Sequence, residues 1–469
     1  MDIRQELHEA PDEEDFQGPV LLAQVMSRLD EPPRSRSYPW QALIAAGLAV
    51  ALVATFLVIR AHRVAVTPAD NGPTLPVAAN ISGVVSYQFV SPQIGWVNIL
   101  TPAGDTVITR TSDGGRSWRR QLVLSGLSPT PTMQFINDHD GVVIGQHGKI
   151  PTVWLTSDGG VHWQSHVVLV RADEAQAALP GYWAITSGYF LDGKLGWLLL
   201  EPNYGACSGC GLRPASALVY QTSDGGGHWI RLATLANSSL ISSTGPRGME
   251  ISFAASSTGF VTDRSLSVTH DGGQTWRIAD VPFGPPTCPP GTSCGTSFIQ
   301  APTFFTANTG VLVATVAFPI EKPCPGVAAG VSGSPGTGCY YVYEPAARYL
   351  YSSSDGGLSW IESRHLPTTG QLDFIDSQLW TVVSTDGVAE TTDGGASWSA
   401  THAIPIPSGW HVIQAQFLDG QHGWVTLSDE DPVAAQIAAH GGSTVWPKFA
   451  LLGTSDGGVT WHQVPLPAV

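Results

Sequence analysis

Basic residues are scarce in this chain. Only 22 of its 469 residues are Lys or Arg, against 38 Asp or Glu, and the formal net charge is −16. A protein that neutralises nucleic-acid phosphates needs a basic surface, so this deficit excludes nucleic acid as a partner. Beyond residue 60, no segment has the apolar spacing of a packed helix, whereas 52 Gly and 35 Pro suit many short strands joined by turns.

Cysteine is also scarce, and all six copies fall within one third of the chain. They are Cys207, Cys210, Cys288, Cys294, Cys324 and Cys339. An even number in close pairs predicts local disulfides and an oxidising compartment. Nearest neighbours would pair 207 with 210, 288 with 294 and 324 with 339, although other connectivities stay open. A single Cys-x-x-Cys is half a zinc site, so we expect no metal and no other cofactor.

Long hydrophobic runs are absent except for one, Ala42 to Ile59, eighteen residues without a charge. As a helix it would measure about 27 Å, enough to cross the hydrocarbon core. The sequence therefore predicts a transmembrane helix over residues 40–60, after a mostly disordered acidic tail (1–39) and before a stalk (61–79). A cleaved signal peptide is the alternative, which the long acidic region before the run disfavours.

The orientation of this span is predicted from the cysteines, because the arginines on its two sides nearly balance. Paired thiols place the large C-terminal part outside the cell and the tail in the cytoplasm. We therefore predict a single-pass protein of the cell membrane. Apolar residues from Val20 to Leu29 have roughly helical spacing, which suits either docking on a cytoplasmic partner or a transient helix near the membrane.

An eight-residue pattern, Ser/Thr-x-Asp-Gly-Gly-x-Ser/Thr/His-Trp, occurs seven times. Its Asp and Trp residues are Asp113 and Trp118, Asp158 and Trp163, Asp224 and Trp229, Asp271 and Trp276, Asp355 and Trp360, Asp393 and Trp398, and Asp456 and Trp461. We expect each Asp to accept hydrogen bonds from backbone N–H groups a residue or two ahead, and each Gly pair to supply positive φ. The Trp would begin the return strand and wedge between sheets. All these residues are predicted to be structural.

This pattern resembles the Asp-box (BNR) repeat of β-propellers, which occurs in sialidases, sortilin-type receptors and photosystem II assembly and stability factors. The resemblance covers about residues 80–469. It implies that each box is the turn between the third and fourth strands of a blade, at the rim opposite the ligand face. These families share the turn and little of their chemistry, so the resemblance implies a fold more than a function.

A second repeat supports the same architecture. A Phe stands six residues before a Gly, and a hydrophobic residue usually follows the Gly. The Gly and its successor are Gly95-Trp96, Gly141-Val142, Gly196-Trp197, Gly259-Phe260, Gly310-Val311 and Gly423-Trp424. Together the repeats predict an all-β, seven-bladed propeller of four-stranded antiparallel blades over residues 80–469. Ring closure need not borrow a strand from the N-terminus, although Ile81 to Val85 could add one.

The extra length falls in connections that leave the blades on the face away from the boxes. The predicted insertions are residues 171–182, 201–217, 284–302, 319–346 and 428–446. Loops on a rigid scaffold commonly carry function, so we expect a protein, peptide or glycan partner on this loop-rich face. The specific binding residues stay unknown.

A non-catalytic binding or scaffold module fits the sequence better than an enzyme, and among relatives the photosystem II assembly factor-like propellers look most similar. A sialidase would need an arginine cluster, and the propeller has few arginines. No catalytic residue is assigned. The alternatives left open are a two-carboxylate glycosidase and a sensor that signals through the span.

Overall fold

The computed structural model describes residues 83–127, 131–168, 182–203, 216–236, 249–262, 265–279, 281, 296–322, 340–367, 369–429 and 448–467. All of them belong to the unit Val64–Val469. The tail, the predicted span, the stalk and all six cysteines lie outside the described residues, so the predictions about them stay predictions. Within the described ranges, no helix has the length and hydrophobicity that crossing a bilayer requires.

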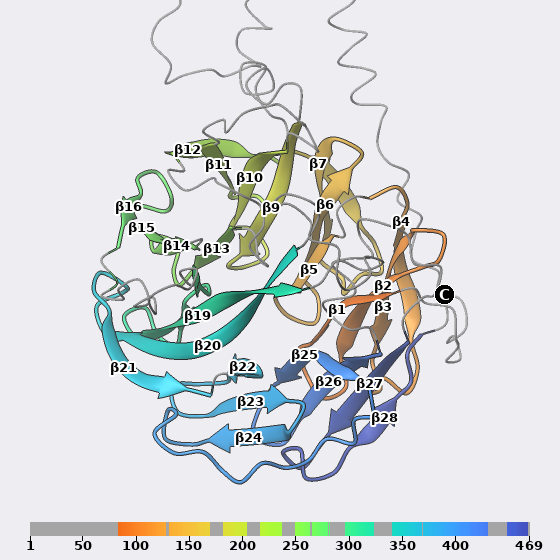
Figure 1. The fold of residues 1–469 in the computed structure, drawn as a ribbon. Coiled ribbons are helices and arrows are strands. Elements are labelled where there is room, and N and C mark those ends of the chain that lie inside the picture. The colour runs from red at the N-terminus through yellow and green to blue at the C-terminus, as the bar shows by residue number, and fades with distance from the viewer. Residues whose placement is uncertain are drawn as a thin grey trace, which may run out of the picture. The chain divides into compact units, whose positions relative to one another are not determined.

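In the described parts of the chain, the strands form seven antiparallel sheets, the blades of a β-propeller (Figure 1). This confirms the predicted all-β, seven-bladed fold. The blades are blade 1, β1 (Gly83–Phe89), β2 (Gly95–Leu100), β3 (Thr106–Thr111) and β4 (Arg119–Leu124); blade 2, β5 (Thr132–Phe135), β6 (Gly141–His147), β7 (Ile150–Thr156) and β8 (Gln164–Val167); blade 3, β9 (Tyr182–Phe190), β10 (Gly196–Asn203), β11 (Ser216–Thr222) and β12 (Ile230–Ala236); blade 4, β13 (Glu250–Phe253), β14 (Gly259–Thr262), β15 (Leu266–Thr269) and β16 (Arg277–Ile278); blade 5, β17 (Thr296–Ile299), β18 (Thr303–Phe304), β19 (Gly310–Lys322), β20 (Tyr340–Ser353) and β21 (Ile361–Leu366); blade 6, β22 (Gln371–Phe374), β23 (Trp380–Ser384) and β24 (Gly387–Thr391); and blade 7, β25 (His411–Phe417), β26 (Gly423–Ser428), β27 (Phe449–Thr454) and β28 (His462–Val464).

The hydrophobic core lies between blades. Buried residues form seven clusters among the described residues, one at each interface between neighbouring blades. Because both faces of a blade are covered by its neighbours, the second strands are nearly continuous buried runs, as in β2 and β26. The outermost strands are solvated, and both residues of β16 are exposed.

The Phe and Gly of the second repeat are cross-strand partners. Phe135 pairs with Gly141, and a Cβ on Gly141 would lie 2.3 Å from the Phe135 ring. The other five glycines of this repeat show the same close approach, at 2.4 to 2.8 Å. The repeat therefore requires a glycine at this position, because the Phe ring occupies the space where a Cβ atom would lie. In blade 6, which lacks the Gly, Trp380 pairs with Phe374 and the rings meet edge to face.

The ring closes between blades 7 and 1 without a shared strand. Gln416 of β25 accepts a hydrogen bond from the Phe89 backbone N–H at 2.8 Å and donates one to the Phe89 carbonyl at 2.9 Å. Tyr87 donates its hydroxyl proton to the Trp424 carbonyl at 2.7 Å, and the Trp424 ring stacks on Phe89. Gln88 makes the same two-way clamp on Phe135, between blades 1 and 2.

Blades 5 and 6 depart from the expected pattern. In blade 5, part of the segments predicted as insertions is strand: β17 lies within 284–302, and β19 and β20 enter 319–346 from both ends. The inner strand is split into β17 and β18 with Pro302 between them, a residue that cannot donate to the ladder. In blade 6, the fourth strand is reduced to one bridge between Val388 and His402.

Candidate functional site

The seven turns, which we call the Asp-Gly-Gly turns, are built around a Ser or Thr hydroxyl. In blade 4, the Thr269 hydroxyl accepts a hydrogen bond from the buried Gly273 N–H at 2.9 Å and donates to Asp271 at 2.7 Å. Asp271 also accepts from the N–H and the hydroxyl of Thr275, at 2.9 and 2.6 Å. The Asp therefore joins both strands of the hairpin, and the left-handed conformations of Gly272 and Gly273 close it.

The same geometry recurs in all seven turns, with one correction to the sequence-based expectation. The Asp carboxylate accepts from the N–H four residues ahead and not from one a residue or two ahead. These bonds join Asp113 to Ser117, Asp158 to His162, Asp224 to His228, Asp271 to Thr275, Asp355 to Ser359, Asp393 to Ser397 and Asp456 to Thr460. The Ser or Thr two residues before the Asp is present in all seven copies, but the sequence did not predict its structural role.

Hydrogen bonds in the turns favour the ionised form of the aspartates. Hydrogen bonds from Thr275, the hydroxyl first and then the backbone N–H, lower the pKa of Asp271 to about 2. Ser359 does the same for Asp355, whose pKa is also about 2. A carboxyl group that stays ionised in this way cannot donate a proton near neutral pH, so these residues are unsuited to general acid catalysis.

The turn tryptophans lie between blades, and none is exposed. Trp118, Trp163 and Trp360 are buried. The remaining ones, which are half-buried, are Trp229, Trp276, Trp398 and Trp461. Four of the seven indole N–H groups donate to a carbonyl of a described residue, as Trp276 does to Gly273 at 2.8 Å and Trp118 to Pro465 at 2.6 Å. The buried N–H groups of Trp229 and Trp360 have no partner among the described residues.

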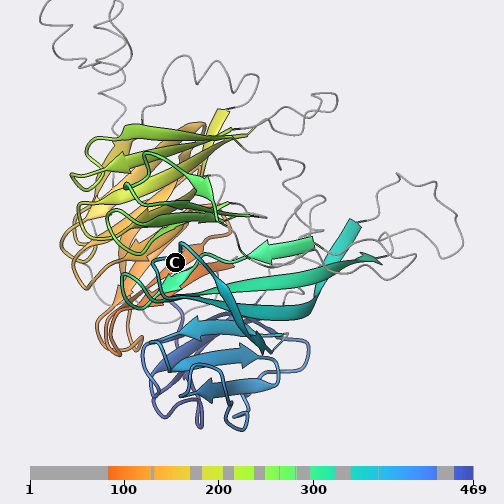
Figure 2. The same ribbon diagram turned by 90° about the vertical axis from the view of Figure 1, so that its left-hand side faces the viewer.

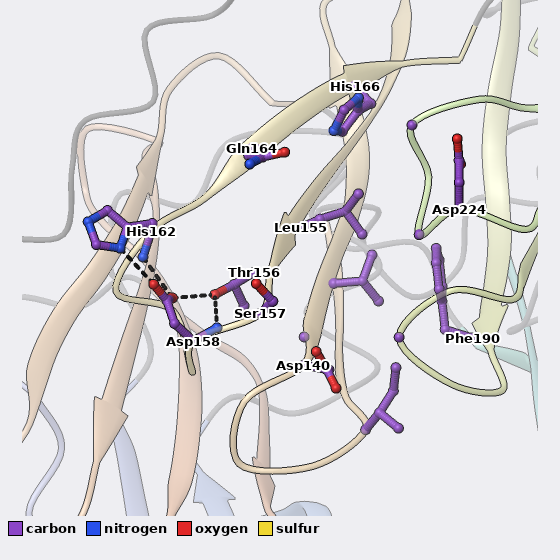
Figure 3. Close-up of a pocket in the computed structure, with 16 residues that line it drawn as sticks. Asp140, Leu155, Thr156, Ser157, Asp158, His162, Gln164, His166, Phe190 and Asp224 are labelled. Carbon is purple, nitrogen blue, oxygen red and sulfur yellow. Dashed lines mark hydrogen bonds and ion pairs between the residues drawn. The ribbon is translucent and has the colours of Figure 1, made fainter.

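A pocket of about 340 Å³ opens between blades 2 and 3, beside their Asp-Gly-Gly turns (Figure 3). Its apolar lining includes Val142, Leu155 and Phe190, and the first glycine of the blade 3 turn, Gly225, also borders it. The pocket lies on the rim of the Asp-Gly-Gly turns, whereas the sequence predicted the binding surface on the opposite face.

Carboxylates dominate the polar lining of this pocket. The described residues that line it include Asp140, Asp158 and Asp224, together with His162 and His166, but no Lys or Arg. The side chain of His162 lies 2.6 Å from Asp158. In Figure 3, Asp140 and Leu155 lie on the blade 2 side, and Phe190 and Asp224 on the blade 3 side. The pocket is thus a part-apolar space with an acidic lining.

The long connections begin and end at the strand ends away from the Asp-Gly-Gly turns. In each blade, the first glycine N–H of the turn donates to the turn between the first two strands, as Gly114 does to Gln93 at 2.9 Å, so both turns share one rim. The remaining connections leave from the other strand ends. There β19 and β20 run on as a hairpin that extends beyond the other strands (Figure 2).

The backbone edges of this hairpin are unpaired among the described residues. The last pair between β17 and β19 is at Ala317, and the first between β20 and β21 is at Arg348. Residues 318–322 and 340–347, which we call the β19–β20 arm, therefore pair only with each other. Five residues of strand correspond to about 16 Å of projection. Arg348, at the base of the arm, is buried and donates to the carbonyls of Pro367 and Gly370.

Within the described ranges, the pocket included, no group of three or more His, Cys, Asp or Glu side chains is arranged to hold a metal ion. Asp373 of β22 differs from the turn aspartates, because burial raises its pKa. Its carboxylate accepts a hydrogen bond from the Phe417 N–H at 2.6 Å, which links blade 6 to blade 7.

The strand pairing and blade interfaces define a seven-bladed β-propeller whose turns carry a repeated Asp-Gly-Gly sequence. No protein-family model matches the chain, and no curated protein matches it. Among solved structures, YCF48 bound to D1 peptide is similar at 15% identity and a TM-score of 0.41, over 81% of this chain and 86% of that one.

YCF48 from Cyanidioschyzon merolae is similar at 15% identity and a TM-score of 0.38, over 76% of this chain and 94% of that one. The Niastella koreensis GH74 enzyme is similar at 13% identity and a TM-score of 0.31, over 83% of this chain and 66% of that one. All these TM-scores lie below 0.5. The architecture of this protein therefore rests on its own strand pairing, and its function on its own residues.

Proposed function

We propose that this protein is a non-catalytic binding module that takes a protein or peptide partner on the face opposite the Asp-Gly-Gly turns. The observation that carries the proposal is the β19–β20 arm, whose two outer edges have no partner strand among the described residues. Such edges present a row of free N–H and C=O groups, which natural proteins cover or keep short. An extended segment of a partner would add to the arm as a further strand.

The test removes the arm and leaves the ring intact. Val316 and Ala347 are paired, so an Asn-Gly turn in place of residues 317–346 would close the shortened hairpin. We expect proteins that co-purify with the full chain from solubilised membranes to fall at least tenfold, by quantitative mass spectrometry with crosslinks mapped to the arm. Asp271→Ala, on the other rim, serves as the control and should keep them. Equal recovery without the arm would contradict the proposal.

We also propose that residues 40–60 tether the propeller to the cell membrane, with the tail in the cytoplasm and the propeller outside. The uncharged run from Ala42 to Ile59 and the clustered cysteines support this. Protease added to intact cells should remove the propeller and leave a tail-tagged fragment in the membrane. A propeller that becomes accessible only after the membrane is permeabilised would refute the orientation.

A glycosidase is the alternative that the acidic composition leaves open, because a two-carboxylate enzyme needs only a suitably placed pair of Asp or Glu residues. Incubation with sialosides and β-glucans separates the two candidates, because turnover by the native chain would establish an enzyme. No turnover, with partner binding that depends on the arm, would support the binding module.

A further inference from the structure

The β19–β20 arm has two edges, and the ladder between its strands decides which backbone groups each edge presents. In an antiparallel ladder, residue pairs that exchange hydrogen bonds alternate with pairs that do not, and the second kind points its N–H and C=O groups outward. Pro319 pairs with Tyr343, and Pro345 pairs with Ala317. Because proline has no N–H, both pairs are of the second kind. The backbone groups of these four residues therefore point away from the ladder.

Two hydrogen bonds at the base of the hairpin support this alternation independently. The Gln300 N–H donates to the Val313 carbonyl at 3.0 Å, so every second residue of β19 from Val313 onward points its backbone toward the β17 side. The Ser363 hydroxyl donates to the carbonyl of Leu350, the partner of Val313, at 3.1 Å. Counted from Leu350 across the one-residue register shift in β20, the outward positions include Pro345. Both strands thus agree with the placement of the prolines.

The two edges of the arm are unequal. On β20, Tyr341 and Tyr343 each present an N–H and a C=O outward, and Pro345 presents a C=O. On β19, the outward position nearest the sheet is Pro319, which presents only a C=O, and Glu321 presents both groups beyond it. A proline is one of the devices by which natural proteins protect a sheet edge. The β20 edge is therefore the better template for a further strand.

The β20 edge is also open at its base. β21 pairs with β20 as far as Arg348, where it ends at Leu366, and the chain then continues to β22 in blade 6. Among the described residues, none pairs with β20 on this side beyond Arg348. A strand added there would continue the line of β21 along the projecting hairpin (Figure 2). Residues 341–345 offer it about 16 Å of edge.

Charge distinguishes two possible occupants of this edge. A second copy of the protein could pair β20 with β20, because two-fold symmetry makes such an edge self-complementary. Each copy has a net charge of −16, however, so two copies repel each other and a segment with Lys or Arg is attracted. Self-pairing centred on Tyr343 would also place each Pro345 opposite Tyr341, and would leave a carbonyl without a donor twice.

We propose that the partner adds to the β20 edge as a strand, through a short extended segment that carries basic residues; this inference rests on the proposed function. The N–H groups of the segment would donate to the carbonyls of Tyr341, Tyr343 and Pro345, and its carbonyls would accept from the N–H groups of the two tyrosines. Main-chain hydrogen bonds of this kind supply affinity, and alternate side chains supply specificity. The segment tolerates a proline only at positions that point away from β20.

The experiment selects heptapeptides from a phage-displayed random library on the solubilised full chain. Peptides that bind the variant with Asn-Gly in place of residues 317–346 are first removed. We expect the remaining peptides to be rich in β-branched and basic residues. Synthetic copies are titrated by fluorescence polarisation. N-methylation of one of the two alternate sets of residues should weaken binding at least about tenfold, and of the other set less than about threefold, because only one set faces β20.

Two proline variants compare the edges directly. Tyr343→Pro removes an outward N–H from β20 at a position that proline fits, and should weaken peptide binding at least about tenfold. Glu321→Pro makes the same change on β19 and should keep binding within about twofold, with Glu321→Gln as its charge control. Tyr343→Val keeps the N–H and a good strand former, so binding within about threefold of the native chain would assign the effect to the backbone.

Strand addition at β20 is refuted if no peptide depends on the arm, if Tyr343→Pro binds as well as the native chain, or if Glu321→Pro loses binding instead. Peptides without an excess of Lys and Arg would refute the basic segment. Should Tyr343→Pro fail to fold, equal affinity for both N-methylated sets would still refute the pairing. A native dimer that Tyr343→Pro converts to a monomer in sedimentation velocity would assign the edge to a second copy and overturn the proposal.

The same variants separate this inference from the proposed function when the co-purifying proteins are measured. Partners that are lost with the arm but kept by Tyr343→Pro would leave the binding module in place and refute only the β20 edge. Partners that stay after the arm is removed would refute both.

Discussion

The role of the turn hydroxyl and carboxylate can be tested by a ranked series in blade 4. Thr269→Val leaves the buried Gly273 N–H without its acceptor, which lies at 2.9 Å in the native turn. An unsatisfied buried donor costs about 1–3 kcal/mol. Asp271→Ala removes an acceptor whose donors on Thr275 are exposed and can bind water instead. We expect its cost to resemble the loss of a helix N-cap, about 0.5–2 kcal/mol.

The expected order of destabilisation is therefore Thr269→Val, then Asp271→Ala, then Asp271→Asn, which keeps one acceptor. Asp386→Asn is the matched control, because it also removes one negative charge, from an exposed residue whose carboxylate accepts no hydrogen bond from the described residues. Roughly 400 folded residues give an unfolding entropy of about 0.8 kcal/mol per kelvin, so 1–2 kcal/mol lowers Tm by about 1–2.5 °C.

Differential scanning calorimetry and urea unfolding measure this series. A Tm for Thr269→Val within about 0.5 °C of the native value, or a control that loses as much as Asp271→Ala, would refute the reasoning. The carboxylate contribution should also depend on pH. The pKa of Asp271 is lowered to about 2 in the folded protein, so its stabilisation is complete above about pH 4 and is lost as the pH falls through 2. The Tm difference between native protein and Asp271→Ala should shrink over that range.

Three further predictions follow from the packing and the sequence. Gly141→Ala would place a methyl group 2.3 Å from Phe135 and should cost about 1–3 kcal/mol, measured by urea unfolding; a neutral change would show that the ring moves aside freely. Gln416→Ala removes both hydrogen bonds to Phe89 across blades 7 and 1, and should speed limited proteolysis at that joint without altering the far side of the ring. The six cysteines should resist alkylation until a reductant is added, as seen by intact mass, and free thiols would contradict the predicted disulfides.

The sequence predicted the architecture well because its repeats record local constraints. A positive φ at Gly272 and the ring of Phe135 above Gly141 each demand one residue type at a fixed spacing. Strand length was predicted less well. The β19–β20 hairpin appears in the sequence only as extra residues between two repeat motifs. Such extra length can be a loop or a longer pair of strands, because hydrogen bonding between strands requires no particular residue spacing.

The pocket between blades 2 and 3 was visible in the sequence only as a variation. Val142 follows its glycine where Trp96, Trp197 and Trp424 follow theirs, and the repeat groups it with them only as a hydrophobic residue. Its meaning depends on the strand register, which pairs it with Leu155 and brings both to the interface facing Phe190. No spacing along one chain states which blade a side chain will face.

The joint between blades 7 and 1 uses the same stacked rings and glutamine clamp as a joint inside the chain, with Trp424 on Phe89 matching Trp96 on Phe135. The position of the chain ends in the ring is therefore not fixed by the contacts between blades. A circular permutant that starts at blade 4 and connects blade 7 to blade 1 by a short peptide should assemble the same ring. Such a protein would show that any of the seven joints can serve as the place where the two ends of the chain meet.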